Sequence, residues 1–217
     1  RRLGLSLGVD LIPHKTCTFD CLYCEVGRTT NKTITSGPFA PVDEILTQLE
    51  ERLKGCTPDV ITLAGSGEPT LHSEIDRIIS GIRAITDTKV VILTNGSLFC
   101  DEAIRKRVLE ADLIMPTLSS AASQTFQTIH RPHRDLALDR IVEGLRQLRR
   151  EFGGLIYLEV ILLAGINDTE EEVTALRPLI QEIRPEKIQL NTVVRPPADA
   201  CAKALDRKRL EEIKLFL

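Results

Sequence analysis

The stretch Cys17-Thr-Phe-Asp-Cys21-Leu-Tyr-Cys24 brings three cysteines together within eight residues. Thiolate sulfur binds zinc, copper(I) or iron–sulfur clusters, so three neighbouring thiolates on one loop predict a shared metal centre. A four-iron cluster normally takes four cysteines. Three protein ligands would therefore leave one iron open to a small molecule, and we favour this iron–sulfur interpretation.

A structural zinc site is the alternative, with His14 as the fourth ligand beside the three cysteines. Structural zinc ligands usually come as two pairs joined by a spacer, whereas this stretch holds one uneven triplet. The other cysteines, Cys56, Cys100 and Cys201, lie far apart and form no second ligand set. Unpaired thiols beside a candidate cluster indicate a reducing compartment, and we expect a cytoplasmic protein.

The spacing Cys-x3-Cys-x2-Cys, with Tyr23 just before the last cysteine, resembles the signature of the radical S-adenosylmethionine (radical SAM) enzymes. The resemblance implies that Cys17, Cys21 and Cys24 hold a [4Fe–4S] cluster and that the amino and carboxylate groups of SAM chelate the fourth iron. It also implies that an electron from the reduced cluster cleaves SAM to methionine and a 5′-deoxyadenosyl radical, which abstracts hydrogen from a substrate. The expected partner is a small electron donor, flavodoxin-like or ferredoxin-like.

The composition is that of a soluble globular protein. Of the 217 residues, 42% are hydrophobic and 27% are charged, and the net charge is −3. No apolar run approaches the roughly 20 residues of a membrane span, so we expect no membrane association. The chain also lacks the basic footprint of a general nucleic-acid binder. It begins at Arg1 rather than Met, and we expect one domain over residues 1–217 that has been trimmed at its ends.

Apolar periodicity predicts strands that alternate with helices. The expected strands cover residues 3–11, 60–64, 90–94, 113–118, 155–163 and 188–193. The expected helices cover residues 42–53, 75–82, 104–108 and 135–152, a segment that starts at Thr169, and residues 205–217. Thr169 and Glu172 form a capping box, and we expect Pro178 to kink or split the helix that follows. This order predicts an α/β fold, a partial (βα)6 TIM-like barrel with a parallel sheet wrapped by helices. Radical SAM enzymes share such a core, so the resemblance covers nearly the whole chain.

The second strand is followed by Gly65-Ser66-Gly67-Glu68-Pro69, at the sheet edge where active sites of parallel α/β folds lie. The glycines would let backbone carbonyls approach an ammonium group, and Glu68 would add negative charge. The segment resembles the Gly-Gly-Glu-Pro motif that contacts the methionine amino group in radical SAM proteins, with Ser66 inserted. A turn that carries a surface glutamate is the alternative.

Polar residues also follow the third and fourth strands. The pair Asn95-Gly96 is first of all a turn signal, and a contact of Asn95 with the ribose of SAM is the second interpretation. By the resemblance, Thr117, Ser119 and Arg131 would hold the ribose and carboxylate of SAM. The two hydroxyls could equally cap the next helix.

Substrate residues are harder to identify. His133 and Arg195, together with Arg131 and Arg134, could surround the barrel mouth with positive charge and suit an anionic substrate. Asn191, in the last strand, needs a partner for its amide, which the core or the substrate could supply. Phe19 and Tyr23 lie within the triplet and are candidates to shield the cluster or to contact SAM.

Three strings resemble a group of small iron–sulfur oxidoreductases related to the tRNA-wyosine synthases. They are Gly-Ser-Gly-Glu-Pro-Thr-Leu, Ile-His-Arg-Pro and Gln-Leu-Asn-Thr-Val-Val-Arg-Pro-Pro. The resemblance implies radical chemistry on an unidentified substrate, with a tRNA base as one candidate. Wyosine synthases carry a second cluster on additional cysteines, for which this chain has no triplet. A glycyl-radical-enzyme activase and a zinc-stabilised binding module without catalysis are the alternatives.

Overall fold

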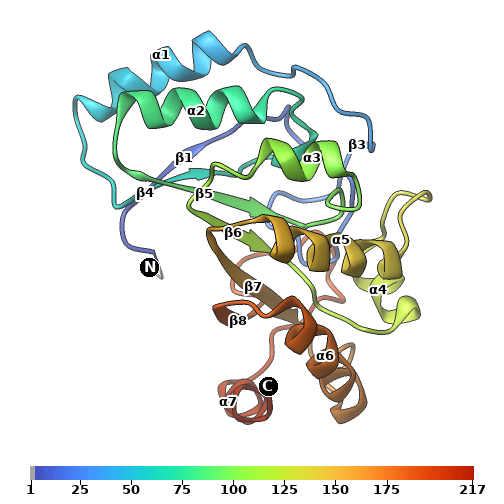
Figure 1. Ribbon diagram of the computed structural model, residues 1–217. Coiled ribbons are helices and arrows are strands. Elements are labelled where there is room, and N and C mark those ends of the chain that lie inside the picture. Colours follow the sequence, from blue (N-terminus) through green and yellow to red (C-terminus); the bar gives the residue numbers. More distant parts are fainter. Residues whose placement is uncertain (1–2) are drawn as a thin grey trace.

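The computed structural model describes residues 3–217. Its main sheet has six parallel strands in the order β1-β4-β5-β6-β7-β8, and the helices wrap around the outer side (Figure 1). The strands are β1 (Ser6–Val9), β4 (Val60–Leu63), β5 (Lys89–Thr94), β6 (Leu113–Pro116), β7 (Leu155–Leu162) and β8 (Lys187–Thr192). Because the two edge strands β1 and β8 do not pair, the barrel is open. The predicted α/β fold, a partial barrel with a parallel sheet, is confirmed.

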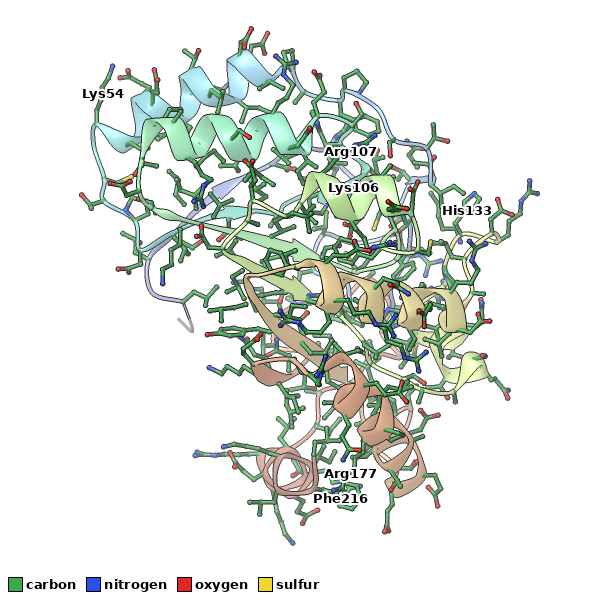
Figure 2. All side chains as sticks on the ribbon, in the orientation of Figure 1. Lys54, Lys106, Arg107, His133, Arg177 and Phe216 are labelled. Atoms are coloured by element: carbon green, nitrogen blue, oxygen red, sulfur yellow. The ribbon has the colours of Figure 1, made fainter. Side chains whose placement is uncertain are left out.

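Helices connect successive strands and cover them with amphipathic faces. They are α1 (Val42–Leu53), α2 (Ile75–Ile85), α3 (Glu102–Arg107), α4 (Ser123–His130), α5 (Leu138–Glu151), α6 (Glu170–Ile183) and α7 (Arg207–Phe216), with a short 3-10 turn η1 at Pro69–Leu71. In α2 the isoleucines at positions 75, 78, 79 and 82 are fully buried at helical spacing. The last helix contacts α6 through the Arg177 guanidinium, which lies 5.0 Å from the centre of the Phe216 ring (Figure 2). Within residues 3–217, no helix is both long and apolar enough to cross a lipid bilayer.

Several element predictions need correction. The first strand is shorter than expected, because Gly4 at φ +78° turns the chain away before Ser6. Two-residue strands β2 (Thr16–Cys17) and β3 (Asn31–Lys32) pair where only a loop was expected. Helix α6 continues through Pro178, since this proline lies on the exposed side, where the carbonyl freed by its missing N–H can meet water.

The helix predicted over residues 135–152 is shorter in the structure, because residues 135–137 belong to the loop before it. Helix α5 starts at Leu138, after Ala137 in an extended conformation. Helix α4 was not predicted at all, because Phe126 and Ile129 are its only buried large apolar residues and make too short a stripe. This missed helix proves to be an anchor for the cysteine stretch.

The inside of the barrel is filled from its amino-terminal end. Val60, Val91, Leu113 and Met115 form a buried cluster there, with Tyr157 packed against it. Since side chains alternate along a strand, Glu159 and Ile161 share the inner face of β7 with Tyr157 and lie nearer the carboxyl ends. The core therefore closes the bottom of the barrel and leaves polar residues toward its mouth.

Candidate iron–sulfur and S-adenosylmethionine site

The cysteine loop, residues 10–30, leaves β1 and lies at the carboxyl ends of the strands, on the side toward which β4 and β5 point (Figure 1). Two tight turns bring its last part together, because Cys24 N donates to the carbonyl of Cys21 (3.3 Å) and Gly27 N to that of Cys24 (3.2 Å). All six cysteines of the chain are free thiols. The three predicted ligands are partly buried on one compact loop.

The end of α4 holds this loop from one side. The amides of Asp20 and Leu22 donate to the carbonyls of His130 and Ile129, each at 2.9 Å, and His133 N donates to the Thr18 carbonyl at 2.8 Å. The last carbonyls of a helix have no partner within the helix, so the loop supplies the donors that α4 lacks. Arg131, at φ +43°, ends the helix in the left-handed conformation.

The segment after β4 holds the loop from a second side. Lys15 N donates to the Ser66 carbonyl (2.8 Å), and Glu68 N donates to the Thr16 carbonyl (3.1 Å). A Cβ added at Gly67 would lie 1.9 Å from the Thr16 oxygen. Gly65, at φ +132°, faces the Asp10 carboxylate, which accepts hydrogen bonds from Ser66. The backbone contact directly before Cys17 therefore requires glycine at position 67.

Glu68 is turned into the protein. Its side chain is only 2% exposed, and Oε1 accepts hydrogen bonds from the Thr70 amide, the Thr70 hydroxyl and the Thr94 hydroxyl, while Oε2 accepts one from Asn95 N. Burial raises the pKa of Glu68, and the four donors counteract that rise. The carboxylate thus joins the ends of β4 and β5 below the cysteine loop.

Asn95 reaches the cysteine loop. The predicted turn is present, with Gly96 at φ +72° and Ser97 N donating to Asn95 Oδ1 at 3.0 Å. The Nδ2 atom of Asn95 lies 2.7 Å from Thr18 Oγ1 and 3.6 Å from Cys17 Sγ. The amide that sequence spacing marked as a turn also contacts the first predicted ligand.

Deprotonation of the buried thiols in this loop is unfavourable unless a positive centre compensates the charge. Burial, followed by the nearby Glu68 carboxylate, raises the pKa of Cys17 to about 12, and burial with the neighbouring thiols raises the pKa of Cys21. The Cys24 thiol adds to the rise in pKa for both of them. Bound metal holds such thiols as thiolates, and the donor set therefore fits an iron–sulfur cluster.

The zinc alternative fits less well. Among residues 3–217, no three His, Cys, Asp or Glu side chains converge as ligands of a single metal ion, and His14 is exposed. A Cys3His site requires that convergence around one tetrahedral ion. A four-iron cluster instead distributes its thiolates over separate irons.

His130 is a contact that sequence analysis missed. It is 1% exposed, and its ring centre lies 5.2 Å from that of Phe19 and 5.1 Å from that of Phe126. Its Nδ1 atom is 3.4 Å from Cys21 Sγ and 3.4 Å from Tyr23 Oη. Burial lowers the pKa of His130 to about 3, which keeps the imidazole neutral. The string Ile-His-Arg-Pro pointed to this region, but no spacing linked its histidine to the cysteines.

A cavity of about 440 Å³ opens beside the loop, at the mouth of the barrel. Tyr23, Cys24, Glu159, Asn191 and Arg195 are among the residues that line it. Thr117 Oγ1 donates to Glu159 Oε2 (3.0 Å), and Asn191 Nδ2 donates to Glu159 Oε1 (2.5 Å). From the sequence, Glu159 was expected only as part of a strand, and its signal is that of a lone carboxylate in an apolar run. The structure brings Thr117 and Asn191 together on this carboxylate.

Each of the four basic groups that were expected to surround the barrel mouth has an acidic partner, and their role toward an anionic substrate stays a prediction. The Arg131 guanidinium lies 2.8 Å from Asp199, and that of Arg195 lies 2.7 Å from Glu25. His133, labelled in Figure 2, and Arg134 both lie near Asp135, at 3.5 and 3.8 Å. These carboxylates come mostly from distant segments, so sequence spacing gave no sign of them.

Ser119 and Arg131, which were both predicted to contact SAM, lie in different surroundings. Ser119 is fully buried, and its Oγ accepts a hydrogen bond from Ile161 N at 3.0 Å, which puts it in the core rather than on the cavity wall. One guanidinium nitrogen of Arg131, Nη1, is buried without a hydrogen-bond partner in the described part of the chain. Such an orphaned donor fits an anionic group of a bound cofactor.

The family model of the radical SAM superfamily matches residues 11–177. A UPF0026 protein of Synechocystis is 34% identical, over 90% of this chain and 73% of that protein. A protein of Brachyspira hyodysenteriae named GTPase Obg is 41% identical, over 100% of this chain and 32% of that protein. A UPF0026 protein of Methanocaldococcus jannaschii is 38% identical, over 94% of this chain. The chain spans less than two thirds of the length of the last two relatives, 32% and 64%.

Solved structures share the fold at low sequence identity. A radical SAM methyltransferase from Sphaerobacter thermophilus superposes with a TM-score of 0.74 at 17% identity, over 98% of this chain and 62% of that one. TYW1 with a lysine-pyruvate adduct bound gives a TM-score of 0.69 at 15% identity, over 92% of this chain and 68% of that one. The family model over residues 11–177 and the likeness to the Synechocystis protein show that the chain belongs to the radical SAM superfamily, whose enzymes use a [4Fe–4S] cluster and S-adenosylmethionine, and within it to the UPF0026 family.

Proposed function

We propose that Cys17, Cys21 and Cys24 ligate three irons of the [4Fe–4S] cluster and leave the fourth iron to SAM. The observation that carries this proposal is the anchoring of the cysteine loop at the carboxyl ends of the strands, between the end of α4 and the Gly67 segment. A loop held on two sides keeps its ligands in position, and its partial burial limits the access of water to the cluster. Burial raises the pKa of the Cys17 and Cys21 thiols, and a bound cluster would supply the positive charge that holds them as thiolates.

We propose that SAM lies between this loop and the cavity at the barrel mouth. Tyr23 and Cys24 line that cavity from the loop side, and the Glu159 carboxylate faces them from β7. Glu159 can accept hydrogen bonds from hydroxyl or amino groups, with Thr117 and Asn191 fixing its orientation. The orphaned nitrogen of Arg131 would receive the carboxylate of SAM.

Four of the remaining predicted SAM contacts would serve this site from the loop side. Gly65 and Gly67 allow the close backbone approach below the cysteines, while Glu68 and Asn95 connect that backbone to the end of β5. When bound, the cluster would supply the electron for the reductive cleavage of SAM, which is the source of the radical chemistry on the substrate. The chain itself binds, orients and shields the reactants.

Radical SAM enzymes need an electron donor, and for this chain we propose a flavodoxin-like or ferredoxin-like protein. We further propose that this chain works in the cytoplasm, because its six thiols are unpaired. For the substrate we propose a base of tRNA. Three strings that resemble the iron–sulfur oxidoreductases related to the wyosine synthases, together with the fold overlap with TYW1, support that class. An activase of a glycyl radical enzyme is the second candidate, supported by a weaker overlap with a domain of a pyruvate-formate lyase-activating enzyme, with a TM-score of 0.56 over 73% of this chain.

The test uses anaerobically reconstituted protein with dithionite and SAM. We expect 5′-deoxyadenosine and methionine in equal amounts, and none from the Cys24→Ala variant. Addition of unmodified tRNA should increase 5′-deoxyadenosine and yield a new nucleoside in digested tRNA. If a glycyl radical enzyme instead of tRNA increases the product and acquires a radical signal, the activase function replaces the tRNA proposal. No 5′-deoxyadenosine under any condition would contradict the cysteine assignment.

A further inference from the structure

Two side chains outside the cysteine triplet direct nitrogen atoms at its sulfur atoms. His130 Nδ1, at the end of α4, lies 3.4 Å from Cys21 Sγ, and Asn95 Nδ2, after β5, lies 3.6 Å from Cys17 Sγ. Sulfur is larger than oxygen, so these separations are hydrogen-bond distances. Each of the two sulfurs therefore has a nitrogen atom from a different part of the fold within hydrogen-bond distance, and His130 Nδ1 lies at the same 3.4 Å from Tyr23 Oη.

The orientation of the Asn95 amide is fixed by its other contacts. Oδ1 accepts the Ser97 amide hydrogen, so the NH2 group must face the cysteine loop. One of its two hydrogens is directed at Thr18 Oγ1, 2.7 Å away. The other is then available to Cys17 Sγ.

The position of His130 is fixed as firmly. Its ring lies against Phe19 and Phe126, and its backbone carbonyl accepts the Asp20 amide. The histidine is thus attached to the cysteine loop through both its ring and its backbone. A thiolate can only accept hydrogen bonds, so a thiolate at Cys21 favours the tautomer with hydrogen on Nδ1.

We propose that His130 and Asn95 are positioning residues that donate hydrogen bonds to the thiolates of Cys21 and Cys17 and thereby raise the reduction potential of the bound cluster. The inference rests on the proposed role of the cysteines as cluster ligands. Reduction adds negative charge that is shared with the thiolates, and donors to those sulfurs stabilise the reduced state more than the oxidised state. The two residues would thus make the cluster easier to reduce by the electron donor.

The first test is a redox titration of reconstituted His130→Phe, at the same iron content as wild type, followed by EPR. Phenylalanine keeps the ring among Phe19 and Phe126 but removes the donor. We expect the equilibrium constant for reduction to fall up to about tenfold, which is a shift of about −59 mV for a one-electron couple. Asn95→Ala should shift the potential in the same direction. The matched control is His72→Phe, because His72 is equally buried but bonds to Ala40.

A second test needs no variant. Pulsed EPR of the reduced wild-type cluster in protein with isotopically labelled histidine should show weak coupling to one imidazole nitrogen. An unchanged potential in both His130→Phe and Asn95→Ala, or the absence of that coupling in wild type, would overturn the inference while leaving the cysteine assignment intact. A wild-type protein that assembles no cluster would overturn the cysteine assignment itself and this inference with it.

Discussion

Replacing Gly67 with alanine tests how the cysteine loop is held. The new Cβ would lie 1.9 Å from the carbonyl oxygen of Thr16, an atom of the backbone that no rotamer change can move. Either the Gly67 segment or the residue before Cys17 must therefore shift by more than 1 Å, on the order of the overlap that must be removed. Such a shift disturbs the hydrogen bonds from Glu68 N to Thr16 and from Lys15 N to Ser66.

The free-energy change follows from these contacts. Overpacking costs about 1–3 kcal/mol, and two weakened backbone hydrogen bonds add about 1 kcal/mol each. Alanine reduces the entropy of the unfolded chain and returns about 0.5–1 kcal/mol. The free energy of unfolding should fall by about 3 kcal/mol, which leaves most domains of this size folded.

Urea unfolding followed by circular dichroism measures this change, and iron content after reconstitution measures the effect on the loop. We expect Gly67→Ala to remain folded and to bind clearly less iron than wild type. Gly8→Ala is the matched control, since a Cβ at Gly8 meets no atom within 4 Å; it should leave the iron content unchanged and raise the free energy of unfolding by about 0.5–1 kcal/mol through the entropy of the unfolded chain. Wild-type stability and iron content in Gly67→Ala would refute the argument that this backbone contact positions the ligands.

Three further substitutions separate the roles of the site and the scaffold. Tyr23→Ala should weaken SAM binding more than it lowers iron content, because the ring lines the cavity and is not a ligand; equal loss of both would indicate mere structural support. In Glu159→Gln, one of the two carboxylate oxygens that accept hydrogen bonds from Thr117 and Asn191 becomes an NH2 group. The affinity for SAM, measured by calorimetry, should fall about tenfold while the iron content is retained. Unchanged affinity would exclude the carboxylate from the SAM site. Glu151→Ala leaves the Arg105 guanidinium, which is 8% exposed, without its carboxylate partner and should lower the free energy of unfolding in urea by about 2 kcal/mol. Lys106→Ala breaks an exposed ion pair and should leave the unfolding midpoint unchanged. Equal midpoints of the two variants would refute this ranking.

The fold was largely readable from the sequence because long strands and helices repeat their apolar residues at fixed periods. Those periods predicted all six strands of the sheet and most helices. Helix α4 lacked that signal, since it buries only Phe126 and Ile129 among large apolar residues. The two-residue strands β2 and β3 were also invisible, because pairs so short depend on the path of the loop around them.

The site was readable only where its chemistry lies in one short segment. Three cysteines at fixed spacing predicted a metal centre, whereas His130 contacts Cys21 from a segment 109 residues away. The ion pair between Arg195 and Glu25 joins residues 170 positions apart, so no local pattern pointed to the acidic partner of this arginine. Contacts of this kind follow from the closure of the barrel and not from local patterns.

The central claim is that three thiolates of one loop hold a four-iron cluster and leave one iron open to SAM. Mössbauer spectroscopy of protein reconstituted with isotopically labelled iron tests it most directly. We predict that addition of SAM changes the signal of one iron in each cluster and leaves the other three unchanged. A protein without iron–sulfur signals, or a four-iron cluster whose irons are all insensitive to SAM, would contradict the account.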